Sequence, residues 1–180
     1  KYDILNVSFA ETDGGDRAVV TFHLDNGIYA SEAQFIEDIK TCQARGQKVN
    51  ISLGGQNGII SVTSAADKVK FVNSVIGIIE KYGFDGLDID FEGTSAGGYS
   101  PAFDQPNQQA QYMIDAIREI CDHFGDNFIL TMAPETAYVQ FGYMSSLAPA
   151  YMTLIHGLRD KLTCLHVQLY NTGNSSALDG

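Results

Sequence analysis

The fold follows from one stretch of sequence, Asp85-Gly86-Leu87-Asp88-Ile89-Asp90-Phe91-Glu92, in which carboxylates alternate with apolar residues. We predict a strand over residues 84–92. Successive side chains of a strand point to opposite faces of a sheet. Asp88, Asp90 and Glu92 therefore share one face, and the apolar residues between them share the other. The apolar face can pack on helices, which directs the three carboxylates to the opposite side of the sheet.

Short strand-like runs alternate with helical stretches on both sides of this acidic strand. Further strands are predicted over residues 2–10, 18–24, 47–55, 127–135 and 163–171. Helices are predicted over residues 31–45, 65–82, 107–124 and 150–162. A loop is predicted over residues 94–106 and a polar tail over residues 172–180. Strands that alternate with helices indicate an α/β fold with a parallel sheet covered by helices.

The alternation alone leaves two architectures open. Six predicted strands fit either an open doubly wound sheet or most of an eight-stranded barrel. The sequence contains no domain boundary, low-complexity tract or repeat beyond the alternation itself, so we expect a single domain.

The charge balance argues against two classes of partner. Acidic side chains outnumber basic ones by 22 to 11, for a formal net charge of −11. A nucleic-acid-binding protein needs basic surface to neutralise phosphates, and an anionic membrane repels an acidic chain. No apolar run is long enough to span a bilayer, and we expect any signal peptide to be absent or already removed. A neutral polymer suits this charge better, although solubility alone also explains it.

Cysteine and histidine show no metal-binding pattern. The three cysteines, Cys42, Cys121 and Cys164, lack the close CxxC spacing of metal sites, and each lies in a predicted helix or strand. We expect buried free thiols. The four histidines show neither ligand spacing nor the spacing of a catalytic triad.

The three carboxylates of the acidic strand leave two kinds of chemistry open. Burying them costs free energy unless they share protons, accept hydrogen bonds or bind a cation. Alternating carboxylates can hold Mg²⁺ or Ca²⁺ through oxygen ligands. Alternatively, coupled carboxylates raise one pKa so that an acid stays protonated near neutral pH. Glu92 is then the proton donor, because it lies at the carboxyl end of the strand, where barrel active sites form.

The acidic strand matches the DGxDxDxE signature of family 18 glycoside hydrolases, the chitinase family. Ser52-Leu53-Gly54-Gly55 resembles the SxGG motif of that family. Two further stretches resemble the motifs of bacterial members on the fifth and sixth strands, Thr131-Met132-Ala133-Pro134-Glu135 and Gln168-Leu169-Tyr170-Asn171. The four motifs occur in the order of the family and together cover nearly the whole chain.

This resemblance implies a (β/α)8 TIM barrel, of which the chain covers about the first six β/α units. The family has eight strands and usually a Trp on the last, whereas this chain has no Trp. A barrel of this type typically needs about 250 residues. We therefore expect residues 1–180 to form a family 18 catalytic domain that lacks its C-terminal part, with six strands in an open parallel arc.

The resemblance also implies a role for each acidic residue. Glu92 is the general acid and base, and Asp90 orients the 2-acetamido group of the sugar. Asp88, deeper in the barrel, shares a proton with Asp90. Tyr170 hydrogen-bonds the acetamide oxygen, and Glu92 and Tyr170 are expected to face the same hollow.

The remaining implied site residues bind the sugar: Gln168, Asn171, Met132 and Gly55. For Gly54 and Gly55 an alternative stays open, a turn that needs positive φ and makes no substrate contact. The expected partner is chitin or an N-acetylglucosamine oligosaccharide, with no cofactor and no metal. We expect a secreted monomer.

Three other functions remain open at this point. An endo-β-N-acetylglucosaminidase acting on N-glycans shares the implied fold. A chitinase-like lectin or inhibitor also shares it, but such proteins usually lack the acidic Glu, which this chain retains as Glu92. The third is a metal-dependent enzyme that uses the same carboxylates.

Overall fold

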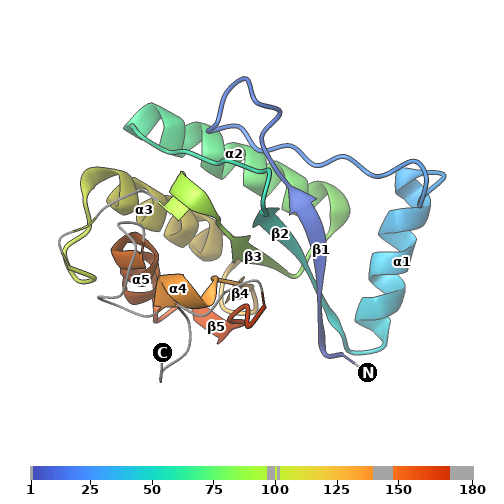
Figure 1. Cartoon of the computed structure of the whole chain (residues 1–180). Coiled ribbons are helices and arrows are strands. Elements are labelled where there is room, and N and C mark those ends of the chain that lie inside the picture. Colours follow the sequence, from blue (N-terminus) through green and yellow to red (C-terminus); the bar gives the residue numbers. More distant parts are fainter. Residues whose placement is uncertain (1, 97–99, 101, 140–147, 171–180) are drawn as a thin grey trace.

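A computed structural model describes residues 2–96, 100, 102–139 and 148–170. Five parallel strands pair in chain order within one sheet, with β1 and β5 outermost (Figure 1). Their bounds are β1 Ile4–Ala10, β2 Lys48–Gly54, β3 Gly86–Asp90, β4 Ile129–Met132 and β5 Leu162–Leu165. The predicted α/β class with a parallel sheet is therefore confirmed, and the strands run in the predicted order.

Helices connect successive strands, as parallel pairing requires. They are α1 Glu32–Ala44, α2 Ala65–Tyr82, α3 Gln108–Phe124, the single turn α4 Thr136–Val139 and α5 Ala148–Leu158, with the 3₁₀ turn η1 at Gly93–Ala96. Side-chain oxygens of Ser31, Ser64 and Asn107 accept hydrogen bonds from backbone N–H groups three residues ahead, which fixes the starts of α1, α2 and α3. No helix among the described residues is long and apolar enough to cross a membrane.

The hydrophobic core lies between the sheet and its helices. The apolar residues of the acidic strand, Leu87, Ile89 and Phe91, are buried in it, as the alternation predicts. Helices α2 and α3 lie side by side (Figure 1) and contribute Val75, Ile79, Met113 and Ile117 to the same core. This packing fixes the face of β3 that carries the carboxylates.

The strand predicted over residues 18–24 is wrong. The described backbone pairs there only through one antiparallel bridge, between Glu11 and Thr21. The N–H of Val20 donates instead to the Ser74 hydroxyl on α2. Phe22 packs edge-on against Tyr82. The branched and aromatic residues of this segment therefore fill the core from a loop, and burial rather than strand pairing accounts for the composition.

Other predicted elements differ at their ends. β4 is shorter than the predicted 127–135, and α5 covers 148–158 rather than 150–162. β5 begins at Leu162 and ends at Leu165, well before residue 171. The residues after β5 run beside the end of β4 and are held there by separate backbone hydrogen bonds. The N–H of His166 donates to the carbonyl of Met132, and the N–H of Gln168 donates to the carbonyl of Pro134. The described residues thus form five strands rather than the six predicted.

Candidate active site

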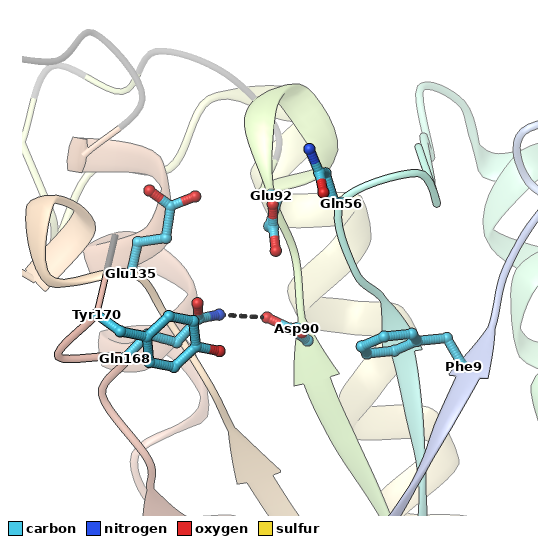
Figure 2. Close-up of a pocket in the computed structure, with 7 residues that line it drawn as sticks. All are labelled: Phe9, Gln56, Asp90, Glu92, Glu135, Gln168 and Tyr170. Carbon is cyan, nitrogen blue, oxygen red and sulfur yellow. Dashed lines mark hydrogen bonds between the residues drawn. The ribbon is translucent and has the colours of Figure 1, made fainter. Parts of the chain in front are cut away.

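A cavity of about 380 Å³ opens at the carboxyl ends of the strands. Each strand, or the segment directly after it, contributes to its wall, and Figure 2 shows the side chains that converge there. Active sites of β/α barrels lie at this end of the sheet. The lining residues are Phe9, Gln56, Asp90, Glu92, Glu135, Gln168 and Tyr170.

Asp88 lies beneath the cavity and is 2% exposed. The register places Ser52 of β2 and Thr131 of β4 opposite it on the two neighbouring strands. The Ser52 hydroxyl donates to Oδ2 over 2.6 Å, and the Thr131 hydroxyl donates to Oδ1 over 2.5 Å. Hydrogen bonds to both oxygens make burial of this carboxyl group affordable and fix its orientation.

Asp90 is the last residue of β3 and borders the cavity. Its Oδ1 accepts a 2.8 Å hydrogen bond from the side-chain amide of Gln168, which also donates to the carbonyl of Ala133. Burial, followed by the charges of Glu92 and Asp88, raises the pKa of Asp90 to about 6, against the opposing effect of the Gln168 hydrogen bond. Asp90 thus exchanges its proton close to neutral pH.

Glu92 lies two residues beyond the end of β3, so it is outside the strand in which it was predicted. Its side chain nevertheless points into the same cavity as Asp90 (Figure 2). Burial raises the pKa of Glu92, and the charge of Glu135 raises it further. A carboxyl group of raised pKa at the mouth of a cavity is suited to donate a proton.

Gln168 and Tyr170 both line the cavity, as their spacing of two predicts, although they follow β5 rather than belong to it. Both amide hydrogens of Gln168 are engaged by Asp90 and Ala133. Its side chain therefore orients Asp90, and its carbonyl oxygen accepts no hydrogen bond from the described residues. Tyr170 is 63% exposed and lies in the same cavity as Glu92, as expected. Asn171 lies outside the described residues.

Met132 and Gly55, which were expected to contact the sugar, are not among the described residues that line the cavity. Met132 is fully buried and pairs in register with Ile89. Gly55 has φ +70°, and a Cβ there would lie 2.8 Å from the Phe9 ring. Its N–H donates to the carbonyl of Asp90. The geometry of Gly55 therefore fits the turn that was the alternative to substrate contact.

Three residues of the cavity were not predicted from the sequence: Phe9, Gln56 and Glu135. Each lies near the carboxyl end of a strand, and Gln56 and Glu135 are next to or within a quoted motif. Glu135 ends the stretch Thr131–Glu135, and Gln56 directly follows Gly55. An acidic residue just past a strand was the available signal for Glu135.

No group of three or more His, Cys, Asp or Glu side chains is arranged to hold a metal ion in the part of the chain that the structure describes. The oxygens of Asp88 that would face a cation already accept hydroxyl hydrogen bonds. The three cysteines are free, and Cys121 is buried.

The site therefore combines two neighbouring carboxyl groups of raised pKa in a cavity at the carboxyl ends of parallel strands. Glycoside hydrolases are one class of enzyme that uses two carboxyl groups in a cavity in this way.

Comparison with known proteins agrees. The model of glycosyl hydrolases family 18 matches residues 1–178, and the chain belongs to this family. It is 45% identical to Chitinase Chi52 of Paenibacillus xylanexedens over 99% of the chain and 35% of that protein. It is 46% identical to Exochitinase 1 of Streptomyces olivaceoviridis over 99% of the chain and 33% of that protein.

Among solved structures, a family GH18 chitinase from Chromobacterium violaceum matches with a TM-score of 0.84 and 41% identity, over 96% of this chain and 44% of that one. The chain thus spans about a third of the length of these two curated relatives and less than half of this structural neighbour.

Proposed function

We propose that the protein hydrolyses β-1,4 linkages between N-acetylglucosamine units of chitin or its oligosaccharides, with Glu92 as general acid and base. The observation that carries the proposal is the common placement of Asp90 and Glu92 in one cavity, with raised pKa values for both. The chitinase names of the relatives support the choice of substrate.

The proposed reaction is retaining and assisted by the substrate. Glu92 protonates the glycosidic oxygen while the acetamide oxygen attacks the anomeric carbon, so the bond to the leaving sugar breaks and an oxazolinium ion forms. Glu92, now a carboxylate, removes a proton from water, which opens the ring and returns the original anomeric configuration. A raised pKa suits the first step, because Glu92 must be protonated when the substrate binds.

Asp90 is proposed to hold the acetamide N–H and to stabilise positive charge on the developing ring. Its side chain is already oriented by Gln168, so it need not reorganise in the transition state. Tyr170 is proposed to donate to the acetamide oxygen, and Asn171 to complete the sugar pocket. For Asp88, which accepts from Ser52 and Thr131, we propose that proton sharing with Asp90 is secondary to holding β3 in place.

We further propose that the five described strands belong to an eight-stranded barrel, in which additional strands pair with β1 and β5. A sheet closed in this way has no free edges. The chain order of the strands and the match to a chitinase structure support this arrangement. We also propose that the protein acts outside the cell as a monomer.

The deciding experiment is an assay of the full-length protein on N-acetylglucosamine oligomers, with and without EDTA. We expect release of short oligomers that EDTA does not affect. Glu92→Gln should lower turnover by about 10² to 10⁴ while oligomer binding survives. Binding without release by the unaltered protein would indicate a lectin, and cleavage of N-glycans in preference to chitin oligomers would indicate an endo-β-N-acetylglucosaminidase.

A further inference from the structure

Glu135 places a third carboxylate in the active-site cavity, on the side facing Glu92 (Figure 2). It is half-buried and lies three residues beyond the end of β4. Within the described residues, no hydrogen bond or ion pair reaches its carboxylate. Among the described residues that line the cavity there is no lysine, arginine or histidine. The charge of Glu135 is therefore uncompensated by any described neighbour.

The backbone of Glu135 is held firmly. It forms a parallel bridge with Gln168, and its carbonyl accepts from the Tyr138 N–H over 3.0 Å. The hydroxyl of the next residue, Thr136, donates to the carbonyl of Gln168 over 2.6 Å. Because Gln168 in turn donates to Asp90, the segment that carries Glu135 is tied to the Asp90 carboxylate at the end of β3.

A second approach brings this segment close to the residue after Glu92. The phenol of Tyr138 on α4 lies near enough to the backbone of Gly93 for that backbone to lower its pKa. The same phenol has a raised pKa because of burial, followed by the charge of Glu135. Glu135 and Glu92 therefore lie on segments that are joined through Gln168 and Asp90, and Tyr138 lies near Gly93 on the other side.

The ionisable groups around Glu92 differ in how well their charge is compensated. Asp88 accepts two hydroxyl hydrogen bonds and Asp90 accepts one from an amide, whereas Glu135 accepts none in the described structure. A nearby negative charge disfavours ionisation of a carboxyl group, and the effect is largest when no hydrogen bond or cation compensates that negative charge. The described ionisable groups whose charges act on Glu92, or that share its cavity, are the carboxyls of Asp90 and Glu135 and the phenols of Tyr138, Tyr151 and Tyr170.

We propose that Glu135 is a positioning residue. Its negative charge disfavours loss of the proton from Glu92 and thereby sets the alkaline limit of the pH range in which the enzyme is active. The inference rests on the proposed function, in which Glu92 must be protonated to act. The electrostatics agree, since burial and then the charge of Glu135 raise the pKa of Glu92. Removing the charge of Glu135 lowers that pKa, so Glu92 loses its proton at a lower pH.

The test is the dependence of kcat on pH for the full-length protein, with N-acetylglucosamine oligomers as substrate. Glu135→Gln keeps the shape of the side chain and removes its charge. We expect the alkaline limb to move to lower pH by about half a unit to one unit, and more at low than at high salt. On that limb, kcat falls about three- to tenfold, while on the acid side it stays within about twofold of the unaltered enzyme.

Two control variants separate charge from structure. Glu135→Asp keeps the charge, so its alkaline limb should stay closer to that of the unaltered enzyme than the limb of Glu135→Gln does. Glu37→Gln removes an equal charge from the exposed face of α1, where Glu37 pairs with Lys40, and should leave the profile unchanged. Carbon-13 NMR titration of the glutamate carboxyls reports the pKa of Glu92 directly in each protein, independently of turnover.

An alkaline limb that coincides in Glu135→Gln and the unaltered enzyme would overturn the inference. A loss of kcat that is equal at every pH, with the pKa of Glu92 unchanged by NMR, would also overturn it. Failure of the proposed function is a separate result, because it requires that Glu92→Gln retain turnover.

Discussion

The side-chain amide of Gln168 donates a 2.8 Å hydrogen bond to Oδ1 of Asp90, although the two residues are 78 positions apart in the sequence. The same amide nitrogen donates to the carbonyl of Ala133 at the end of β4. One side chain therefore fixes the orientation of a reactive carboxyl group relative to the neighbouring strand. Four predictions follow from this and from related contacts at the site.

The first concerns Gln168 itself. Gln168→Leu removes both donated hydrogen bonds, so Asp90 becomes less well oriented and its pKa rises further. We expect kcat on N-acetylglucosamine oligomers to fall about 10- to 100-fold. Gln56→Leu is the matched control, because Gln56 lines the same cavity without a hydrogen bond to Asp90 in the described structure, and its effect on kcat should be smaller. Equal kcat values for both variants would contradict this role.

The second concerns assistance by the substrate. If the acetamide oxygen is the nucleophile, chitin oligomers are cut with retention and fully deacetylated chitosan is not cut. A thiazoline analogue of the cyclised sugar should inhibit, because it resembles the intermediate more closely than the substrate does. NMR of the first product formed measures the anomeric configuration. An initial α-anomer, or rapid cleavage of chitosan, would show that the mechanism is different.

The third concerns stability and pH. The pKa of Asp90 is raised from 3.8 to about 6, so the folded protein binds this proton more tightly than the unfolded chain does. Stability therefore falls as pH rises from about 4 to about 6 and stays lower above that. Asp90→Asn removes this loss. Because Asp90 borders a cavity that admits water, we expect a gain of only about 1 to 2 kcal/mol at pH 7 and little at pH 4.

Thermal unfolding at the two pH values measures this effect. Asp115→Asn is the control, since Asp115 is exposed on α3 and accepts one hydrogen bond from a glutamine amide, as Asp90 does. Its midpoint temperature should match that of the unaltered protein at both pH values. A gain for Asp90→Asn that is the same at pH 4 and pH 7 would mean that something other than the ionisation of Asp90 is responsible.

The fourth concerns the turn after β2. Gly54 has φ +105°, and a Cβ there would lie 2.4 Å from the carbonyl oxygen of Asp90. Gly54→Ala should destabilise the protein by about 2 kcal/mol or more and lower activity, because the turn would displace the end of β3. Gly46 has φ +80° with open space around it, so Gly46→Ala carries only the cost of its backbone conformation, about 1 kcal/mol. Equal losses in denaturant unfolding would exclude a steric effect at Gly54.

The sequence predicted the parts of the site that lie on regular strands. Alternation placed Asp88 and Asp90 opposite Leu87 and Ile89, and the structure has both sets on the expected faces. The placement of Glu135 and Glu92 in one cavity could not be predicted from the sequence. Both residues follow a strand, and the path of an irregular segment depends on contacts such as those of Tyr138.

The wrong strand over residues 18–24 has a related cause. Val20 is buried and Phe22 is partly buried, so both positions carry branched or aromatic residues like those of a strand. A local sequence pattern indicates burial, but it does not indicate which group forms the hydrogen bond with a backbone N–H. The N–H of Val20 is bonded to Ser74, which is 54 positions away. No periodicity within the segment reports such a partner.

The hydrogen bonds of Asp88 to Ser52 and Thr131 have an evolutionary consequence. They join three adjacent strands through one side chain, so replacing Asp88 disturbs the scaffold whether or not the protein is an enzyme. Glu92 has no such structural role, since its carboxylate accepts no hydrogen bond from the described residues. In a lineage that loses hydrolysis but keeps sugar binding, we expect Glu92 to be substituted first, while selection for folding alone preserves Asp88.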